Sequence, residues 1–256
     1  MKKLIWLIIL FPILFAGVEF DGVDDKIPLT NNASLYSDTP LTVGMWFKVI
    51  GGLGGDGDLF GIGENELDRW ALQIDAADST IKVYSDIDNS GLNISTTTNV
   101  FNVWHSVIVT IHGTNGTVIY IDGVSEGSDA NAGAKLGFDD LTQGNCIAGL
   151  GLRAGTDGPD AYNSFVGIIC DFFISNSVWT DNQIKTYSAG KIKRFPLQDA
   201  NLICYLELLD EPDGTDGNGD TFLDMSESGN SGTGNWGANA SGLTAKAEEV
   251  LSYPGD

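Results

Sequence analysis

The 256-residue sequence has few basic residues, few histidines and few cysteines. Its 13 lysines and arginines stand against 35 aspartates and glutamates, which gives a formal net charge of −22 at pH 7. A protein this acidic repels phosphate backbones, so nucleic acid is excluded as a partner. Only two histidines and three cysteines are present, and no CxxC pair or phosphate-binding glycine loop occurs. The sequence therefore gives no sign of a Cys/His metal cluster or of nucleotide chemistry.

The three cysteines are Cys146, Cys170 and Cys204. Because three is an odd number, at least one thiol is free or pairs between chains. A Cys170–Cys204 or a Cys146–Cys204 bridge would be compatible with export, and the sequence does not choose between them. We favour burial of the cysteines as small apolar side chains over a catalytic or metal-binding role.

Only one long hydrophobic run stands out, and it lies at the N-terminus. Met1 is followed by two lysines, residues 4–15 are almost entirely apolar, and Ala16 is small. This order is typical of a secretory signal peptide, residues 1–16, cleaved near Ala16. The run is shorter than the roughly 18–20 residues that span a bilayer. The sequence therefore predicts a secreted, extracellular protein with no membrane insertion after signal cleavage.

Glycine, by contrast, is abundant, with 33 residues. Residues 41–49 and 70–74 alternate between apolar and other side chains, which predicts strands with one buried face. Asn115-Gly116 and Asp122-Gly123 are two-residue hairpin signals around a strand at 117–121, because these residue types tolerate positive φ. Further strands are expected at residues 103–112, 146–152, 165–175 and 202–208.

A single short helix is expected near residues 180–190. Thr180 and Gln183 have the spacing of a capping box, and Gly190 fits the C-terminal stop. Many short strands, glycine-rich turns and almost no helix indicate an all-β protein with a sandwich or jelly-roll fold.

Five segments resemble, in the same order, motifs of the laminin-G-like (LamG-like), concanavalin A-like jelly-roll family. They are Phe20-Asp21-Gly22-Val23-Asp24-Asp25 and residues 41–48, 104–110, 118–124 and 165–174. The resemblance covers about residues 18–190. It implies an all-β, concanavalin A-like β-sandwich jelly-roll domain over residues 17–195. In one departure, Cys170 stands where the family has the first acid of a pair, which leaves only Asp171.

Residues 196–256 form an acidic C-terminal segment with twelve acidic residues and one basic residue, Lys246. Within it, residues 202–208 resemble a strand that precedes the Phe-Asp-Gly motif in the family, and residues 224–233 resemble the turn that follows that strand. An element that is normally N-terminal thus stands at the C-terminus. We expect a permuted strand plus loop that completes the sandwich; the start of a second, unfinished repeat is the alternative.

The acidic segment also has the ligand spacing of a calcium-binding loop. Its oxygen-bearing residues stand at positions one, three, five, nine and twelve: Asp216, Asn218, Asp220, Asp224 and Glu227. Alternating carboxylates and one late bidentate acid suit a hard cation. Thr221 replaces the glycine expected at position six, and a solvated acidic turn is the alternative. From the family resemblance, a structural calcium near a rim would instead use Asp21, Asp24 and Asp171.

Trp46 and Tyr84 lie on candidate strands and are the candidate ligand-binding residues. Exposed aromatic rings stack on sugars through apolar contact. The alternative for both is packing within the protein, because each face of a sandwich sheet can be covered. A carboxylate pair for glycoside hydrolysis would have to come from Glu64, Glu66 and Asp68. We expect these three in a solvated loop between strands.

The residues and the resemblance together lead to one function and two alternatives. The first is a secreted recognition module, not an enzyme, that binds carbohydrate or cell-surface glycoconjugates with support from structural Ca2+. It rests mainly on the resemblance. The second is a structural or adhesive surface or virion protein that self-associates through its jelly roll. The third is a glycoside hydrolase.

Overall fold

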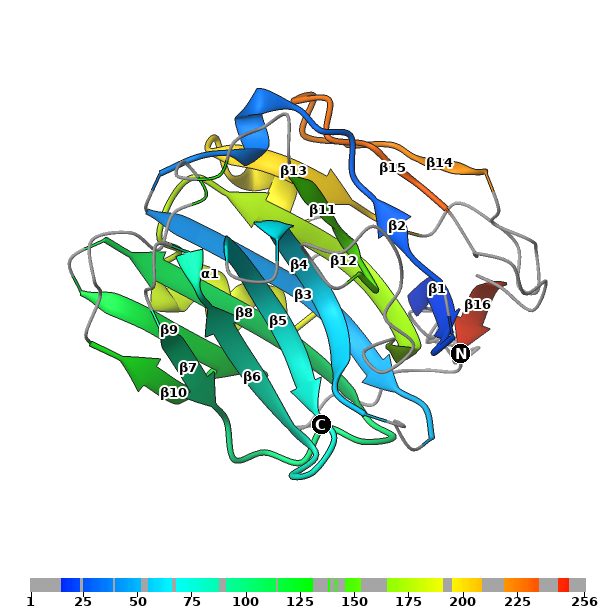
Figure 1. The fold of residues 1–256 in the computed structure, drawn as a ribbon, viewed down its shortest axis with the longest axis horizontal. Coiled ribbons are helices and arrows are strands. Elements are labelled where there is room, and N and C mark those ends of the chain that lie inside the picture. Colours follow the sequence, from blue (N-terminus) through cyan, green and yellow to red (C-terminus); the bar gives the residue numbers. More distant parts are fainter. Residues whose placement is uncertain are drawn as a thin grey trace, which may run out of the picture.

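The structure, a computed structural model, consists mainly of two β-sheets (Figure 1). It describes residues 15–23, 25–38, 40–51, 55–65, 68–87, 91–113, 115–130, 138, 141, 146–152, 165–190, 195–208, 219–234 and 244–248. The strands are β1 (Phe15–Asp21), β2 (Ile27–Pro28), β3 (Leu41–Val49), β4 (Gly57–Asn65), β5 (Asp68–Asp75), β6 (Thr80–Ser85), β7 (Leu92–Ser95), β8 (Trp104–His112), β9 (Gly116–Ile121), β10 (Val124–Asp129), β11 (Ile147–Leu150), β12 (Val166–Ser175), β13 (Leu202–Leu206), β14 (Thr221–Phe222), β15 (Gly232–Thr233) and β16 (Thr244–Glu248). The helices are α1 (Asp181–Ser188) and the 3-10 turns Ala33–Leu35 and Phe195–Gln198.

The two large sheets pack face to face. The eight-stranded sheet has the order β10-β9-β8-β3-β12-β1-β16, with β13 also paired to β12. The six-stranded sheet has the order β2-β11-β4-β5-β6-β7 and lies nearer the viewer in Figure 1. The strands β14 and β15 form a separate small hairpin. The prediction of an all-β sandwich with one short helix is confirmed.

The hydrophobic core fills the space between the sheets. On β3, alternate residues from Leu41 to Val49 belong to it, and on β5 it takes Trp70, Leu72 and Ile74. These are the apolar positions of the two alternating segments, so period two identified the buried face correctly. Burying this apolar surface is the main source of the sandwich's stability.

A second hydrophobic cluster lies on the outer face of the eight-stranded sheet, beneath α1. The helix contributes Ile184 and Tyr187, which pack with Trp46 and Phe173 of the sheet. The helix begins as predicted. The Thr180 side chain accepts from the Gln183 backbone N–H, and the Gln183 side-chain oxygen accepts from the Thr180 backbone N–H. Because α1 covers this face, β3 and β12 are buried on both sides.

The two predicted hairpin turns differ. Asp122 and Gly123 have φ +50° and +79°, as a two-residue turn of the predicted kind requires. The expectation of a second such turn at Asn115-Gly116 is wrong. Gly116 is the first residue of β9 and pairs with His112, so it lies in the ladder, although it keeps φ +87°. A Cβ at Gly116 would meet the backbone oxygen of Asp129, so the glycine is needed for close strand approach.

The acidic C-terminal segment contributes strands to the same sandwich. β3 pairs along one edge of β12, and the other edge is shared by β1, opposite residues 166–169, and by β13, opposite residues 172–175. The two strands thus follow one another along β12. Asp171 stands between them at a bulge with φ +51°. β16 pairs with β1, and Gly232 forms a bridge to Leu29. An evolutionary origin by circular permutation stays a hypothesis.

Cys146, Cys170 and Cys204 are free and buried. Neither of the two disulfide pairings left open by the sequence is formed, and burial as small apolar side chains matches the favoured interpretation. Among the described residues, no helix has both the length and the apolar character needed to cross a membrane.

Candidate functional site

The outer face of the six-stranded sheet carries a row of polar side chains. Trp70, Leu72 and Ile74 of β5 point into the core. Because successive side chains of a strand point to opposite faces, Arg69 and Gln73 point outward. The segment that predicts a core strand therefore also places a basic and an amide side chain on the opposite face of the sheet, where both are largely buried.

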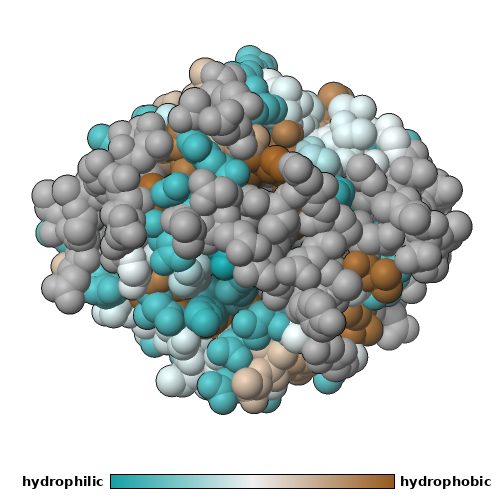
Figure 2. Space-filling view, in the orientation of Figure 1, coloured by the Kyte–Doolittle hydropathy of each residue, from teal (hydrophilic) through white to brown (hydrophobic). Residues whose placement is uncertain are grey.

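The register of β5, β6 and β7 brings further side chains beside them. Tyr84 pairs with Ala71 on one side and with Asn93 on the other. Lys82 pairs with Gln73 and with Ser95. We call the residues Arg69, Lys82, Tyr84, Asn93 and Ser95 the Tyr84 patch. Figure 2 shows hydrophilic residues gathered over this part of the face.

Tyr84 and Arg69 are the best-defined contact of the Tyr84 patch. The guanidinium carbon of Arg69 lies 5.3 Å from the centroid of the Tyr84 ring, within the range of a cation–π interaction. Arg69 is 9% exposed and Tyr84 is partly exposed, while Asn93 and Ser95 are exposed. The patch thus offers one oriented aromatic ring together with amide, hydroxyl and cationic donors.

The polar row continues past Ala71, which lies between the Arg69 and Gln73 positions on the same face. The Gln73 side-chain nitrogen donates to the Asp58 carboxylate at 2.5 Å, and both residues are buried. Gly61 of β4 lies opposite Ala71. Ala71 and Gly61 are buried as well, so the exposed part of this face lies at β6 and β7, where Lys82, Tyr84, Asn93 and Ser95 are partly or fully exposed.

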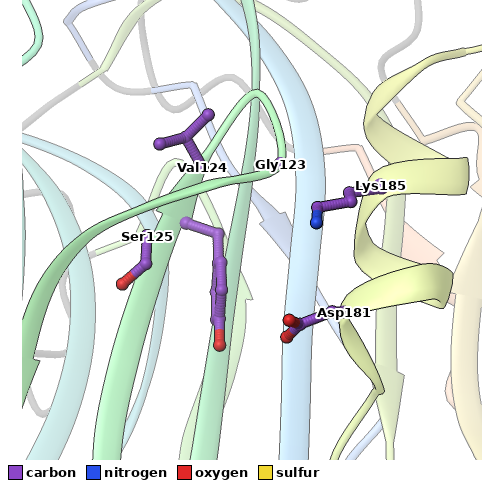
Figure 3. A pocket seen from close by; sticks show the side chains of 6 residues that line it. Gly123, Val124, Ser125, Asp181 and Lys185 are labelled. Atoms are coloured by element: carbon purple, nitrogen blue, oxygen red, sulfur yellow. The ribbon is translucent and has the colours of Figure 1, made fainter.

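A second feature is a pocket of about 420 Å³ between the β9–β10 hairpin and α1 (Figure 3). It is lined by Tyr120, Gly123, Val124, Ser125, Asp181 and Lys185. Burial and the nearby charge of Asp181 raise the pKa of the Tyr120 hydroxyl, although a hydrogen bond with Thr110 opposes the shift. The tyrosine is therefore neutral at physiological pH.

The structure places Trp46 away from solvent. Its side chain is 3% exposed, and its ring centroid lies 6.2 Å from that of Tyr187 of α1. A sugar could stack on Trp46 only after α1 had moved away. The role of Trp46 as an exposed stacking platform is therefore corrected to packing beneath the helix, the alternative that the sequence had left open.

Two of the acidic residues in the predicted rim calcium site are occupied by protein contacts. Asp171 accepts a hydrogen bond from the Tyr205 hydroxyl at 2.6 Å through its carboxylate, and its backbone carbonyl accepts from Tyr187. Asp21 accepts from the Val23 backbone and so shapes the turn after β1. Asp24 lies outside the described residues.

In the predicted calcium loop, Asp224 is likewise bound by protein groups. Its two carboxylate oxygens accept from the backbone N–H groups of Tyr205, Ser226 and Asn230. Glu227 is exposed, Asp220 is partly exposed, and Asp216 and Asn218 lie outside the described residues. Within the described part of the chain, no three His, Cys, Asp or Glu residues lie together as a metal site. Calcium binding therefore stays a prediction.

The three carboxylates weighed for hydrolysis do not all lie in a loop as expected. Glu64 is in β4 and Asp68 begins β5, because the two strands continue almost to the turn that joins them. Glu66 lies outside the described residues. β4 was not among the strands expected from the sequence, because Gly57, Gly61 and Gly63 interrupt the apolar alternation over residues 57–65.

Sequence reasoning found Tyr84 but not its neighbours. Arg69 and Lys82 were identifiable in principle, since both stand at outward positions of alternating segments beside a predicted core residue. Tyr120, Asp181 and Lys185 could not be grouped, because the contact between α1 and the β9–β10 hairpin joins segments about 60 residues apart.

Comparison with known proteins identifies the family. A family model described as the concanavalin A-like lectin/glucanases superfamily matches residues 21–185, and the chain belongs to this superfamily. The jelly-roll resemblance and the fold prediction are thereby confirmed. No curated protein matches the sequence.

Solved structures share the fold at low sequence identity. A candidate carbohydrate-binding protein from Bacteroides ovatus superposes with a TM-score of 0.66 at 20% identity, over 93% of this chain and 62% of its own. The chain thus spans less than two thirds of that protein. A heptameric SAP-like pentraxin from Limulus polyphemus has a TM-score of 0.58 at 14% identity, over 93% and 97% of the two chains. A Ruminococcus gnavus sialidase CBM40 bound to α2,3-sialyllactose has a TM-score of 0.54 at 12% identity, over 66% and 96% of the two chains.

Proposed function

We propose that the protein is a secreted, non-catalytic, lectin-like module that binds carbohydrate through the Tyr84 patch. The observation that carries the proposal is the contact between Arg69 and Tyr84, 5.3 Å from guanidinium carbon to ring centroid, on an outward sheet face. An aromatic ring held by a neighbouring cation gives a sugar ring a fixed surface to stack on. The superfamily and the carbohydrate-binding proteins among the similar folds support the same class of ligand.

The surrounding groups suit hydroxyl-rich ligands. Asn93 and Ser95 supply exposed donors and acceptors, and Lys82 supplies a cationic donor. Arg69 and Lys82 are two of only 13 basic residues in a chain of net charge −22. Their presence on one face makes it locally less repulsive to the electronegative oxygens of a saccharide.

Secretion is the second part of the proposal and rests on residues 1–16. Cleavage after Ala16 would leave Gly17 at the new N-terminus, inside β1. The pairs between β12 and residues 18–21 would remain, while those of Phe15 and Ala16 with β16 would be lost. The test is N-terminal sequencing of the exported protein, and an intact Met1 on exported protein would contradict cleavage.

A glycan array tests the binding function. The purified protein should bind a defined subset of glycans, and Tyr84→Ala should weaken binding to each hit by about tenfold or more, since the stacking surface is lost. Tyr84→Phe should keep most of the affinity. Tyr120→Ala, on the other sheet, is the matched control and should leave the hits unchanged. A blank array with folded protein, or equal effects of the two alanine variants, would overturn the proposal.

The same array, run in calcium and again in EDTA, tests the calcium prediction. Calcium support predicts stronger binding in calcium for the hits that depend on Tyr84. Equal binding in the two buffers would show that sugar recognition needs no metal.

A further inference from the structure

The pocket between α1 and the β9–β10 hairpin is separate from the Tyr84 patch. It lies on the outer side of the eight-stranded sheet, whereas the Tyr84 patch belongs to the outer face of the six-stranded sheet. Its volume of about 420 Å³ falls within the range of small-molecule sites. The two features can therefore be tested independently.

The hairpin wall of the pocket is held in place by hydrogen bonds. The Asp122 carboxylate bonds with Nδ1 of His105 at 2.7 Å and accepts from the Ser106 backbone at 2.9 Å. Gly123, at φ +79°, brings the turn against the helix, and a Cβ there would lie 3.5 Å from Cα of Lys185. A side chain at this position would be strained and would press against α1.

The other wall of the pocket, α1, is hydrogen-bonded to β8, the same strand that holds the hairpin. Ser106 Oγ donates to Ser188 Oγ at 2.8 Å, and both serines are buried. The hairpin and α1 are thus both anchored on β8, at neighbouring positions. A pocket whose walls share one anchor is formed before a ligand arrives, which lowers the ordering cost of binding.

The lining combines an apolar surface with two opposite charges. Tyr120 supplies a partly exposed ring, and Val124 beside it is 62% exposed, one of the largest exposures of an apolar side chain in the described residues. Asp181 and Lys185 are exposed residues on consecutive turns of α1. Figure 3 shows both pointing from the helix toward the hairpin.

Asp181 and Lys185 are an acid in the first turn and a base in the last turn of α1. Four residues apart on a helix, an acid followed by a base has the spacing of an ion pair. Nevertheless, across the described part of the chain the side chains of Asp181 and Lys185 form no ion pair or hydrogen bond, with each other or with a third group. The pocket therefore presents an acceptor charge and a donor charge at the same time, beside an aromatic ring.

We propose that this pocket binds a small zwitterion, with its ammonium group against Asp181 and the Tyr120 ring and its carboxylate against Lys185. A ligand with one charge would gain from one of the two helix residues and be repelled by the other. A zwitterion satisfies both, and its cation also gains from the face of the tyrosine ring. Because its net charge is zero, the strongly acidic protein does not repel it as it would an anion.

Four small probes of different charge separate the alternatives, measured by calorimetric or NMR titration at low salt. They are glycine betaine, a zwitterion; choline, a cation; acetate, an anion; and xylose, a neutral polyol. We expect betaine to bind about tenfold more tightly than each of the others, since only betaine is attracted by both Asp181 and Lys185. Equal or tighter binding of xylose, choline or acetate would overturn the proposal, and so would the absence of betaine binding at millimolar concentrations.

Substitutions then test whether betaine binds in this pocket. Asp181→Asn and Lys185→Gln should each weaken betaine binding about tenfold, while keeping side-chain size and the α1 cap. Tyr120→Phe should retain affinity and Tyr120→Leu should lose it, because the ring face is the proposed contact. Lys26→Gln, beside β2 of the other sheet, is the control for a lost positive charge and should leave betaine binding unchanged. Betaine binding that survives both helix substitutions would show that it occurs elsewhere and overturn the assignment.

Discussion

The Tyr205 hydroxyl donates a hydrogen bond of 2.6 Å to the Asp171 carboxylate and so joins the C-terminal segment to the middle of β12. Asp171 lies at the bulge where β12 changes partner from β1 to β13. The Asp171 backbone N–H also donates to the Glu207 carbonyl, and the Asp171 carbonyl accepts from Tyr187 of α1. One residue at an uncommon φ thus connects β12, the C-terminal segment and the helix.

Tyr205→Phe should destabilise the fold by removing this bond. A hydrogen bond to a charged group contributes about 1.5–3 kcal/mol, and we expect a loss of that size in urea unfolding. Tyr36→Phe is the matched control, since the Tyr36 hydroxyl donates to the uncharged Asn31 side chain and the loss of that bond should cost less. Equal losses of unfolding free energy for the two substitutions would show that the Tyr205–Asp171 bond stabilises the fold no more than a hydrogen bond between neutral groups.

Alkaline pH should weaken the protein through the same tyrosine. Burial, and then the charge of Asp171, raises the pKa of Tyr205 well above its usual 10.0. The unfolded chain therefore loses its tyrosine proton first, and the stabilisation is complete below about pH 10 and is lost as pH rises further. Urea midpoints measured across this range should fall less steeply for Tyr205→Phe than for the unmodified protein. Parallel curves would contradict the assignment to Tyr205.

The C-terminal segment should be required for folding. Cys204, Tyr205 and Leu206 of β13 are fully buried, and β13 pairs directly with β12. A truncated chain that ends at Arg194 should therefore lose cooperative unfolding, as measured by near-UV circular dichroism during heating. Unchanged thermal unfolding of the truncated chain would mean that β13 does not complete the sandwich.

The three cysteines should be unreactive until the protein unfolds. Burial, and then the charge of Glu64, raises the pKa of the Cys146 thiol to about 11. Burial also raises the pKa values of Cys170 and Cys204 well above their usual value. Because the thiolate is the reactive form, alkylation at pH 8 should label none in the native protein and all three in denaturant without reductant. Fewer than three labelled thiols in denaturant would indicate a disulfide.

Asp224 and Glu227 should behave differently, although both belong to the predicted calcium loop. Asp224→Ala removes the acceptor of three backbone N–H groups, and we expect a loss of about 2–4 kcal/mol in calcium and in EDTA alike. Glu227→Ala, at an exposed position, should stay within about 0.5 kcal/mol. If calcium instead stabilises the unmodified protein and both substitutions abolish that effect, the loop binds the ion.

Much of the fold was predictable because its signals are local. The alternation around Trp70, the positive-φ turn at Asp122-Gly123 and the capping box at Thr180 each depend on neighbouring residues only. Where local signals were weak, prediction was less accurate. The end of β4 was taken for a loop, and Gly116 was assigned to a turn although it pairs with His112.

The site was less predictable, because burial depends on what covers a sheet face. Trp46 alternates out of the core as a surface residue would, but α1 packs over it. Tyr84 also points outward, and no helix comparable to α1 lies over it among the described residues. The sequence pattern is the same for both, and only the position of the helix separates them.

By itself, the sequence determined that this chain forms an antiparallel sandwich of the concanavalin A-like superfamily with an acidic surface. Period two, turn residues and composition act over a few positions, and five motifs in order identify the superfamily. Only the tertiary structure decided that β13 follows β1 along one edge of β12, that Arg69 lies against Tyr84, and that Asp181 and Lys185 face Tyr120. These contacts depend on strand register and on packing between distant segments, which no local pattern of residues specifies.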